Sequence, residues 1–205
     1  MAARFVVLEG PEGAGKTTQL TRLAARVPDA VVTREPGGTP GGEAVRAALL
    51  DPGAAWSPLA EALLMNAARD AHMRGVVLPA LSAGRSVLCD RFADSTEAYQ
   101  GGGGGLDDAR IDALRSWVCA REPDLVLVFD LDAGEGLARA AARGRADRFE
   151  AKGAAYHERV RARFRRIAER PDAVLIDASG SPDEVSARVS AAVAERLPGL
   201  LTPGA

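Results

Sequence analysis

The sequence predicts an α/β protein with a doubly wound, five-stranded parallel sheet and helices on both faces. Five short runs are apolar at nearly every position, which is typical of strands covered on both sides. Helical patterns separate these runs along the chain, and this alternation indicates parallel crossover units. Ligands of such sheets bind beyond the carboxyl ends of the strands, so the residues that follow each strand are the candidate site.

The predicted strands and helices alternate in order. The runs that we expect to form strands are 5–8, 30–33, 86–90, 124–132 and 173–177. The patterns that we expect to form helices are 16–27, 41–50, 57–82, 93–100, 107–120, 133–143, 154–170 and a last helix after Ser181. Ser57-Pro58 is a good helix start, because a hydroxyl cap precedes proline at the first helical position. We expect the glycine run at 101–105 to be a mobile surface connection.

Length and composition favour one domain over residues 1–205. The chain has 205 residues, of which 47% are hydrophobic and 26% charged, an ordinary globular composition. No apolar run approaches the roughly 20 residues that cross a bilayer, so no membrane partner is expected. A net charge of −2 argues against bulk capture of nucleic acid. The two cysteines are too few for a disulfide framework and are interpreted as small buried hydrophobes in a reducing cytosol.

The segment GPEGAGKT matches the phosphate-loop pattern G-x-x-x-x-G-K-[ST] between a predicted strand and a predicted helix. Its backbone N–H groups and the helix N-terminus would surround the phosphates of ATP. Lys16 would neutralise the β- and γ-phosphates, and Thr17 would bind Mg²⁺ together with Asp90, an acid at a strand end. The loop residues that we expect to bind ATP are Gly10, Pro11, Glu12, Gly13, Ala14, Gly15, Lys16, Thr17 and Thr18.

Glu12 is unusual within this loop, because a carboxylate repels the phosphates that the loop surrounds. We therefore expect its side chain to turn away from them, toward a hydroxyl or a cation.

A phosphate loop by itself does not distinguish a motor, a GTPase switch, a kinase or a nucleotide sensor. A GTPase typically carries N-K-x-D, but the one asparagine, Asn66, is followed by alanine. Arginines lie where a kinase would hold an anionic acceptor: Arg34 and Arg91 follow strands, and further arginines cluster after the fourth strand's helix. A small-molecule kinase is favoured, with a non-catalytic ATP-binding module as the alternative.

Five strings in order resemble the thymidylate kinase family. They are FVVLEGPEGAGKTT, TREPGGT, EALLMNAARDAH, DRFADSTEAYQGGG and RGRADRFE, and the resemblance runs from about residue 5 to 176. It is closest in kind to bacterial members that supply the catalytic arginine from a lid, here at about 143–153. The resemblance implies a fold of the P-loop NTPase type and transfer of the γ-phosphoryl of ATP to dTMP, giving dTDP and ADP for dTTP synthesis, with Mg²⁺. It also implies a cytoplasmic homodimer.

The roles at the phosphates follow from this resemblance and from charge. Arg91 is expected to bridge the two nucleotides, and Arg143 and Arg148 to close over the γ-phosphate. Arg34 would either touch the acceptor phosphate or brace its own loop. The acceptor phosphate is already largely dianionic at neutral pH, so no general base is required, and both histidines are interpreted as structural or surface residues.

The base and sugar of dTMP are expected to lie against the third and later helices. Arg69 would reach a base carbonyl, and Thr96 and Tyr99 would contact the base edge and sugar. The remaining expected dTMP contacts are Glu12, Pro36, Met65, Arg91 and Gln100. In the family an aromatic residue usually occupies the place of Met65 and stacks on thymine. This departure leaves another nucleoside-monophosphate kinase as an alternative.

Overall fold

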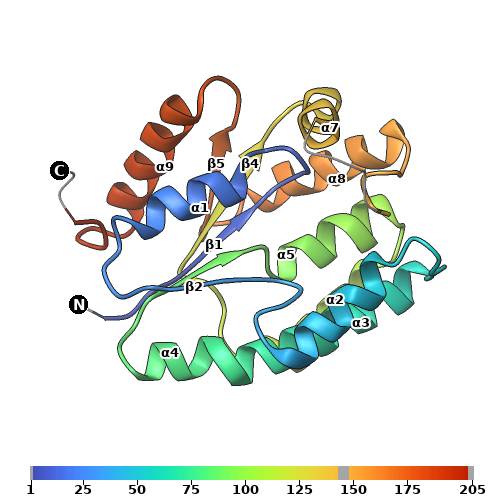
Figure 1. Cartoon of the computed structure of the whole chain (residues 1–205), viewed down its shortest axis with the longest axis horizontal. Helices are drawn as coiled ribbons and strands as arrows, with labels where there is room; N and C mark the ends of the chain where they lie inside the picture. The colour runs from blue at the N-terminus through green and yellow to red at the C-terminus, as the bar shows by residue number, and fades with distance from the viewer. Residues whose placement is uncertain (1, 143–147, 203–205) are drawn as a thin grey trace.

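The computed structural model describes residues 2–142 and 148–202. Their strands form one parallel sheet in the order β2-β3-β1-β4-β5 (Figure 1). The strands are β1 Phe5–Glu9, β2 Val31–Arg34, β3 Val87–Asp90, β4 Leu125–Asp130 and β5 Ala173–Asp177. The predicted doubly wound α/β sheet is confirmed. β1 is the central strand of this sheet, so its carboxyl end lies between the ends of β3 and β4.

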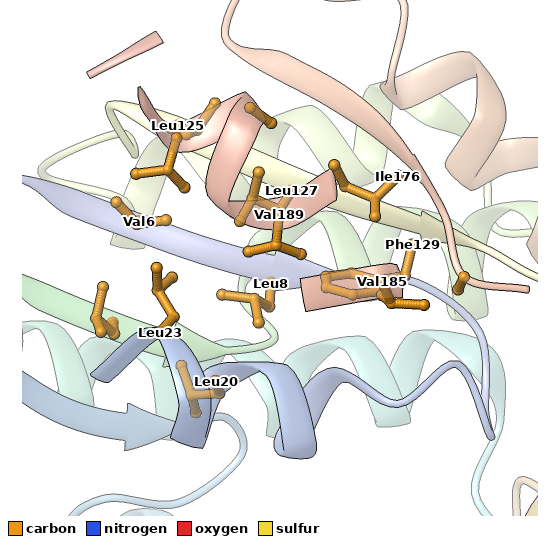
Figure 2. Packing of buried hydrophobic residues seen from close by; sticks show 14 of the residues in the cluster. Val6, Leu8, Leu20, Leu23, Leu125, Leu127, Phe129, Ile176, Val185 and Val189 are labelled. Atoms are coloured by element: carbon orange, nitrogen blue, oxygen red, sulfur yellow. The ribbon is translucent and has the colours of Figure 1, made fainter. Parts of the chain in front are cut away.

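Helices cover both faces of the sheet. The helices are α1 Lys16–Ala24, α2 Pro40–Leu50, α3 Pro58–His72, α4 Leu78–Ser82, α5 Ala93–Thr96, α6 Asp108–Val118, α7 Ala133–Ala141, α8 Ala154–Ile167 and α9 Pro182–Arg196, with π-helical segments η1 Met73–Val77 and η2 Glu97–Gly103. α1 and α9 pack on one face (Figures 1 and 2). η1, α4, η2 and α8 pack on the other, and α3 packs against α2 and α6. None of these helices has the length and apolarity that a membrane crossing needs.

The core follows the alternation of side chains along β1. Val6 and Leu8 point toward α1 and α9 (Figure 2), while Phe5 belongs to the cluster on the opposite face. The expectation of strands covered on both faces is wrong at the two sheet edges. Val32 of β2 is 50% exposed and Leu175 of β5 is 42% exposed, because each edge strand has a neighbour on one side only.

The helix predicted over 57–82 is interrupted by η1. Ser57 caps its start by accepting from Ala60 N–H. Near its end, the N–H of Leu78 donates to Met73 O, five residues back, directly before Pro79, which has no N–H to donate. The wider turn keeps Met73 and Val77 in the core.

The expectation of a mobile glycine connection at 101–105 is wrong. Gly101, Gly102 and Gly103 continue η2, which lies against α8, and Gly101 and Gly103 are buried. A Cβ on Gly103 would lie 2.4 Å from the Tyr156 ring, and one on Gly102 would lie 2.8 Å from Arg163 Cβ. The Tyr156 hydroxyl donates to Tyr99 O across this contact at 3.0 Å. The glycines therefore permit close approach of two helical segments.

Gly103→Ala is expected to lower the free energy of unfolding by about 1–3 kcal/mol, because the added methyl group overpacks the contact with Tyr156. Urea unfolding followed by circular dichroism measures it. Gly153→Ala is the matched control, since a Cβ there meets nothing and the backbone φ is −63°. Equal unfolding midpoints for the two variants would contradict this reading of the glycine run.

Candidate active site

The phosphate loop connects β1 to α1 and closes around the Lys16 ammonium. Gly10, Gly13 and Gly15 have φ values of 138°, 72° and 80°, which favour glycine. Gly13 also lies so close to α7 that an added Cβ would clash with Gly136 O. Lys16 Nζ donates to Gly10 O at 2.9 Å and to Pro11 O at 2.7 Å. The ammonium is thus held across the loop, where it would meet a phosphate.

Burial and the positive charge of Arg91 lower the pKa of Lys16 to about 8. An anionic phosphate would favour the charged ammonium, so ATP binding is expected to raise this pKa and take up about half a proton at pH 8, and about a tenth at pH 7. Calorimetric titration with Mg·ATP, without acceptor, in buffers of different ionisation enthalpy measures the uptake. Lys16→Arg, which keeps a cation that does not titrate, is expected to abolish it. A binding enthalpy independent of buffer at pH 8 would rule the effect out.

Thr17 and Asp90 meet where two neighbouring strands end. β1 and β3 pair with Leu8 opposite Asp90, and Thr17 Oγ1 donates to Asp90 Oδ2 at 2.7 Å. A hydroxyl and a carboxylate oxygen are ligands that Mg²⁺ prefers. The described residues contain no cluster of three His, Cys, Asp or Glu side chains that would hold a metal alone. An ion at Thr17 and Asp90 would therefore complete its shell with phosphate oxygens and water.

Arg91 lies between the phosphate loop and η2, in the left-handed region at φ 69°. Nη1 donates to Gly10 O at 3.1 Å and to Ser95 Oγ at 3.2 Å, and Nη2 donates to Glu12 Oε1 at 2.6 Å. The Tyr99 hydroxyl donates to the same Glu12 oxygen at 2.9 Å. Glu12 thus has a cation and a hydroxyl as partners, the two kinds of partner expected from the sequence.

Glu9, which the sequence interpretation missed, holds the turn that carries Arg91. Its carboxylate is fully buried and accepts from Phe92 N–H at 2.7 Å, Ser95 N–H at 3.0 Å and Ser95 Oγ at 2.7 Å. Burial, reinforced by the charge of Asp94, raises the pKa of Glu9 to about 7. A carboxylate at the end of an apolar strand was the signal available in the sequence.

Two hollows adjoin at Arg91. One lies beside the phosphate loop and is lined by Lys16, Thr17 and Asp90. The other lies between the loop after β2, α3 and η2. Its wall includes expected dTMP contacts: Glu12, Pro36, Met65, Arg69, Arg91, Tyr99 and Gln100. Glu12, Glu35, Arg46 and Arg91 line both hollows, so a ligand in each would meet where these side chains lie.

Arg69 is buried in the wall of the second hollow. Its Nε donates to Glu35 Oε2 at 2.8 Å and its Nη1 to Asn66 Oδ1 at 2.9 Å. Its Nη2 donates to Phe92 O at 3.0 Å and to Thr96 Oγ1 at 3.2 Å. These four bonds leave one of five N–H groups without a hydrogen-bond partner in the described part of the chain. The guanidinium is therefore fixed in place with a donor to spare.

Glu35 anchors this wall from the loop after β2, where the Glu35–Pro36 peptide bond is cis. Its buried carboxylate pairs with Arg69 and with His72 Nδ1 at 2.8 Å, and His72 Nε2 lies 2.7 Å from Thr33 Oγ1. His72 is thus a buried structural histidine, as interpreted. Glu35 was not singled out as a site residue, although it lies inside the TREPGGT string.

A family model described as thymidylate kinase matches residues 8–189. This chain belongs to the thymidylate kinase family. The family resemblance seen in the five strings is confirmed, and the chain catalyses ATP-dependent phosphorylation of dTMP to dTDP.

The relatives extend over nearly the whole chain. A thymidylate kinase of Caulobacter vibrioides is 53% identical over an alignment of 202 positions, which covers 94% of this chain and 97% of that protein. One from Pseudomonas entomophila is 51% identical over an alignment of 209 positions, which covers 98% of each chain. The crystal structure of thymidylate kinase from Ehrlichia chaffeensis has a TM-score of 0.77 and 32% identity, and the match covers 94% of this chain and all of that one. The match therefore spans the residues that line both hollows.

The residues expected in the thymidylate kinase lid are only partly described. Arg143 lies outside the described residues. Arg148 donates from Nε to Leu49 O at 3.0 Å and from Nη1 to Glu61 Oε1 at 2.7 Å, and its guanidinium lies over the Phe149 ring. Arg148 thus contacts α3 and Leu49 of α2, which lines the second hollow, and its expected contact with the γ-phosphate stays a prediction.

Other expected dTMP contacts differ in how closely they approach the hollow. Thr96 is buried behind Arg69 and supports it. Met65 and Tyr99 line the hollow together with Phe149, an aromatic residue that the sequence interpretation did not single out. Arg34 is half-exposed, and its Nη2 donates to both carboxylate oxygens of Glu43 at 2.9 Å. Of the two roles expected for Arg34, this contact corresponds to bracing its own loop.

Proposed function

We propose that the hollow beside the phosphate loop binds Mg·ATP and that the adjoining hollow binds dTMP, with the two phosphate ends meeting at Arg91. The observation that carries the proposal is the position of Arg91 and Glu12 in the walls of both. Two anions repel each other in this arrangement, so a guanidinium between them stabilises both the bound pair and the transition state. In-line transfer then requires positioning and charge rather than a general base.

On the donor side, the backbone of residues 10–18 would surround the phosphates, and Lys16 would turn from Gly10 O and Pro11 O toward phosphate oxygens. The proposed ligands of Mg²⁺ are Thr17 and Asp90. When bound, Mg²⁺ neutralises charge on the transferred phosphoryl group. Arg143 and Arg148 are proposed to contribute positive charge from a lid at about 143–153 of a single domain.

On the acceptor side, the buried Arg69 has one N–H left for a base carbonyl, and Gln100 has an amide oxygen without a partner among the described residues. Thymine offers a carbonyl oxygen at O4 and an N–H at N3, so it matches this donor and acceptor pair. Cytosine offers the opposite pattern. Met65 would contact the base through its sulfur, and Tyr99 would lie against the sugar, with Pro36 toward the acceptor phosphate.

The assembly is proposed to be a cytoplasmic homodimer. Large apolar side chains are exposed on neighbouring helices: Leu59 and Leu63 on α3 and Trp117, 73% exposed, on α6. Both cysteines, Cys89 and Cys119, are free, in keeping with a reducing compartment. Sedimentation equilibrium tests the dimer. Trp117→Glu is expected to shift it toward monomer, and a wild-type monomer at micromolar concentration would contradict it.

An acceptor panel tests the assignment of the two hollows. With Mg·ATP, dTMP is expected to be phosphorylated faster than UMP, CMP or AMP by purified enzyme. A faster reaction with one of the others would favour a different nucleoside-monophosphate kinase, the alternative that Met65 keeps open. Met65→Ala is expected to raise KM for dTMP while leaving KM for ATP within a few-fold of its value, because Met65 lines only the second hollow.

A further inference from the structure

A buried carboxylate on α3, Glu61, contacts the amide of Gln100 in the wall of the acceptor hollow. Only 2% of the Glu61 side chain is exposed, and its Oε2 accepts from Gln100 Nε2 at 3.0 Å. The other oxygen, Oε1, accepts from Arg148 Nη1 at 2.7 Å and lies 3.7 Å from Lys152 Nζ. Neither the phosphate loop nor the lid sequence pointed to Glu61.

The chemistry of this contact determines which way the amide faces. An ionised carboxylate only accepts hydrogen bonds, so it selects the –NH₂ end of the Gln100 amide. The amide oxygen is then turned away from Glu61. Gln100 is 1% exposed, its Oε1 has no hydrogen-bond partner within the described ranges, and the residue lines the hollow. A buried polar oxygen without a partner costs about 1–3 kcal/mol, which a ligand N–H would recover.

We propose that Glu61 is a positioning residue for base selectivity: it locks the Gln100 amide with its oxygen toward the ligand, so that the hollow accepts an N–H from the base. This inference rests on the proposed assignment of the hollow to dTMP. A neutral amide left free to rotate by 180° would present either its oxygen or its –NH₂ group. It would then serve the N3–H of thymine and the bare N3 of cytosine about equally well.

Glu61 also forms ion pairs with two residues of the segment after α7. Arg148 and Lys152 both follow α7 in the chain, so the carboxylate that orients Gln100 is shared with the segment that carries an expected catalytic arginine. Loss of the Arg148 contact would change kcat for every acceptor alike. Loss of amide orientation would change the ratio between acceptors. The ratio is therefore the readout that separates positioning of Gln100 from a merely structural role.

The experiment compares kcat/KM for dTMP and dCMP in the full-length enzyme and its variants. Glu61→Gln is expected to lower the dTMP/dCMP ratio about tenfold or more, because a glutamine at position 61 can either donate to or accept from Gln100. Glu195→Gln, on the exposed end of α9, is the matched control and is expected to leave the ratio unchanged. Where dCMP turnover is too slow, its inhibition constant against dTMP replaces it.

A swapped pair makes the test specific. Gln100→Glu alone places two carboxylates face to face and is expected to weaken dTMP use. The double variant E61Q/Q100E restores one N–H between the two positions and leaves a carboxylate oxygen toward the base. It is expected to recover the wild-type ratio within a few-fold. A ratio unchanged by E61Q, or a double variant no better than its parents, would overturn the inference.

Gln100→Leu separates this inference from the assignment of the hollow. If Q100L leaves KM for dTMP unchanged, the hollow does not bind the base and the proposed function of this site fails. If Q100L raises KM for dTMP about tenfold but E61Q leaves the ratio intact, only the role of Glu61 fails. Thermal unfolding of each variant identifies any that does not fold. If a single variant does not fold, the dTMP/dCMP ratio of E61Q/Q100E decides whether Glu61 orients Gln100.

Discussion

Arg91→Met is expected to lower kcat/KM for dTMP about a thousandfold or more, because the guanidinium between the two hollows would be lost. Methionine is unbranched and can fill the space over the Tyr99 ring where the guanidinium carbon now lies, so the fold is expected to survive. Arg91→Lys keeps the charge but not the planar fork that now reaches Gly10 O, Ser95 and Glu12, and an intermediate loss is expected.

Steady-state kinetics with dTMP and ATP both varied measure this effect. A loss that falls mainly on kcat indicates stabilisation of the transition state, whereas a loss confined to KM indicates ground-state binding. Arg74→Met is the control, since this arginine is 75% exposed and pairs with Asp70 one turn away. An Arg91→Met enzyme within tenfold of the wild type would remove Arg91 from the reaction.

Arg69→Met is expected to lower the free energy of unfolding by about 3–5 kcal/mol, since it leaves the Glu35 carboxylate buried without its guanidinium. Asn66 Oδ1 and Thr96 Oγ1 lose a donor at the same time. Urea unfolding followed by circular dichroism measures the change. The dTMP KM is expected to rise in parallel, because the remaining N–H of Arg69 lies in the acceptor wall.

The double variant R69M/E35Q makes the cause of this instability testable. Removing the charge at position 35 is expected to recover part of the lost stability, because a neutral amide costs less to bury than an unpaired carboxylate. A double variant no more stable than R69M alone would show that lost packing, rather than the buried charge, explains the effect.

The local chemistry of the donor site was predictable because it lies in one contiguous segment. The glycine spacing, Lys16 and Thr17 follow each other along the chain, and a strand before them and a helix after them complete the context. Asp90 and Arg91 were also predictable, since parallel strands bring their carboxyl ends to the same edge of the sheet. In the structure Thr17 does meet Asp90 there.

The buried carboxylates were not predictable in this way. Glu9, Glu35 and Glu61 bind partners 83, 34 and 39 residues distant along the chain. Nothing in their own neighbourhoods reveals those partners. The glycine run was misinterpreted for the same reason. Its composition predicts a flexible connection, and only the structure shows that Tyr156 and Arg163 of α8 lie against it.

The sequence by itself determined the class of fold, the phosphate-binding loop and the family of phosphoryl-transfer enzymes, because each depends on residue types at short, regular spacing. Only the tertiary structure decided which charges are paired and which polar atoms remain without partners. Hydrogen bonds and ion pairs act over a few ångströms, so the folded chain must first bring α3, η2 and the loop after β2 together. The proposed selectivity of the acceptor hollow depends on that arrangement.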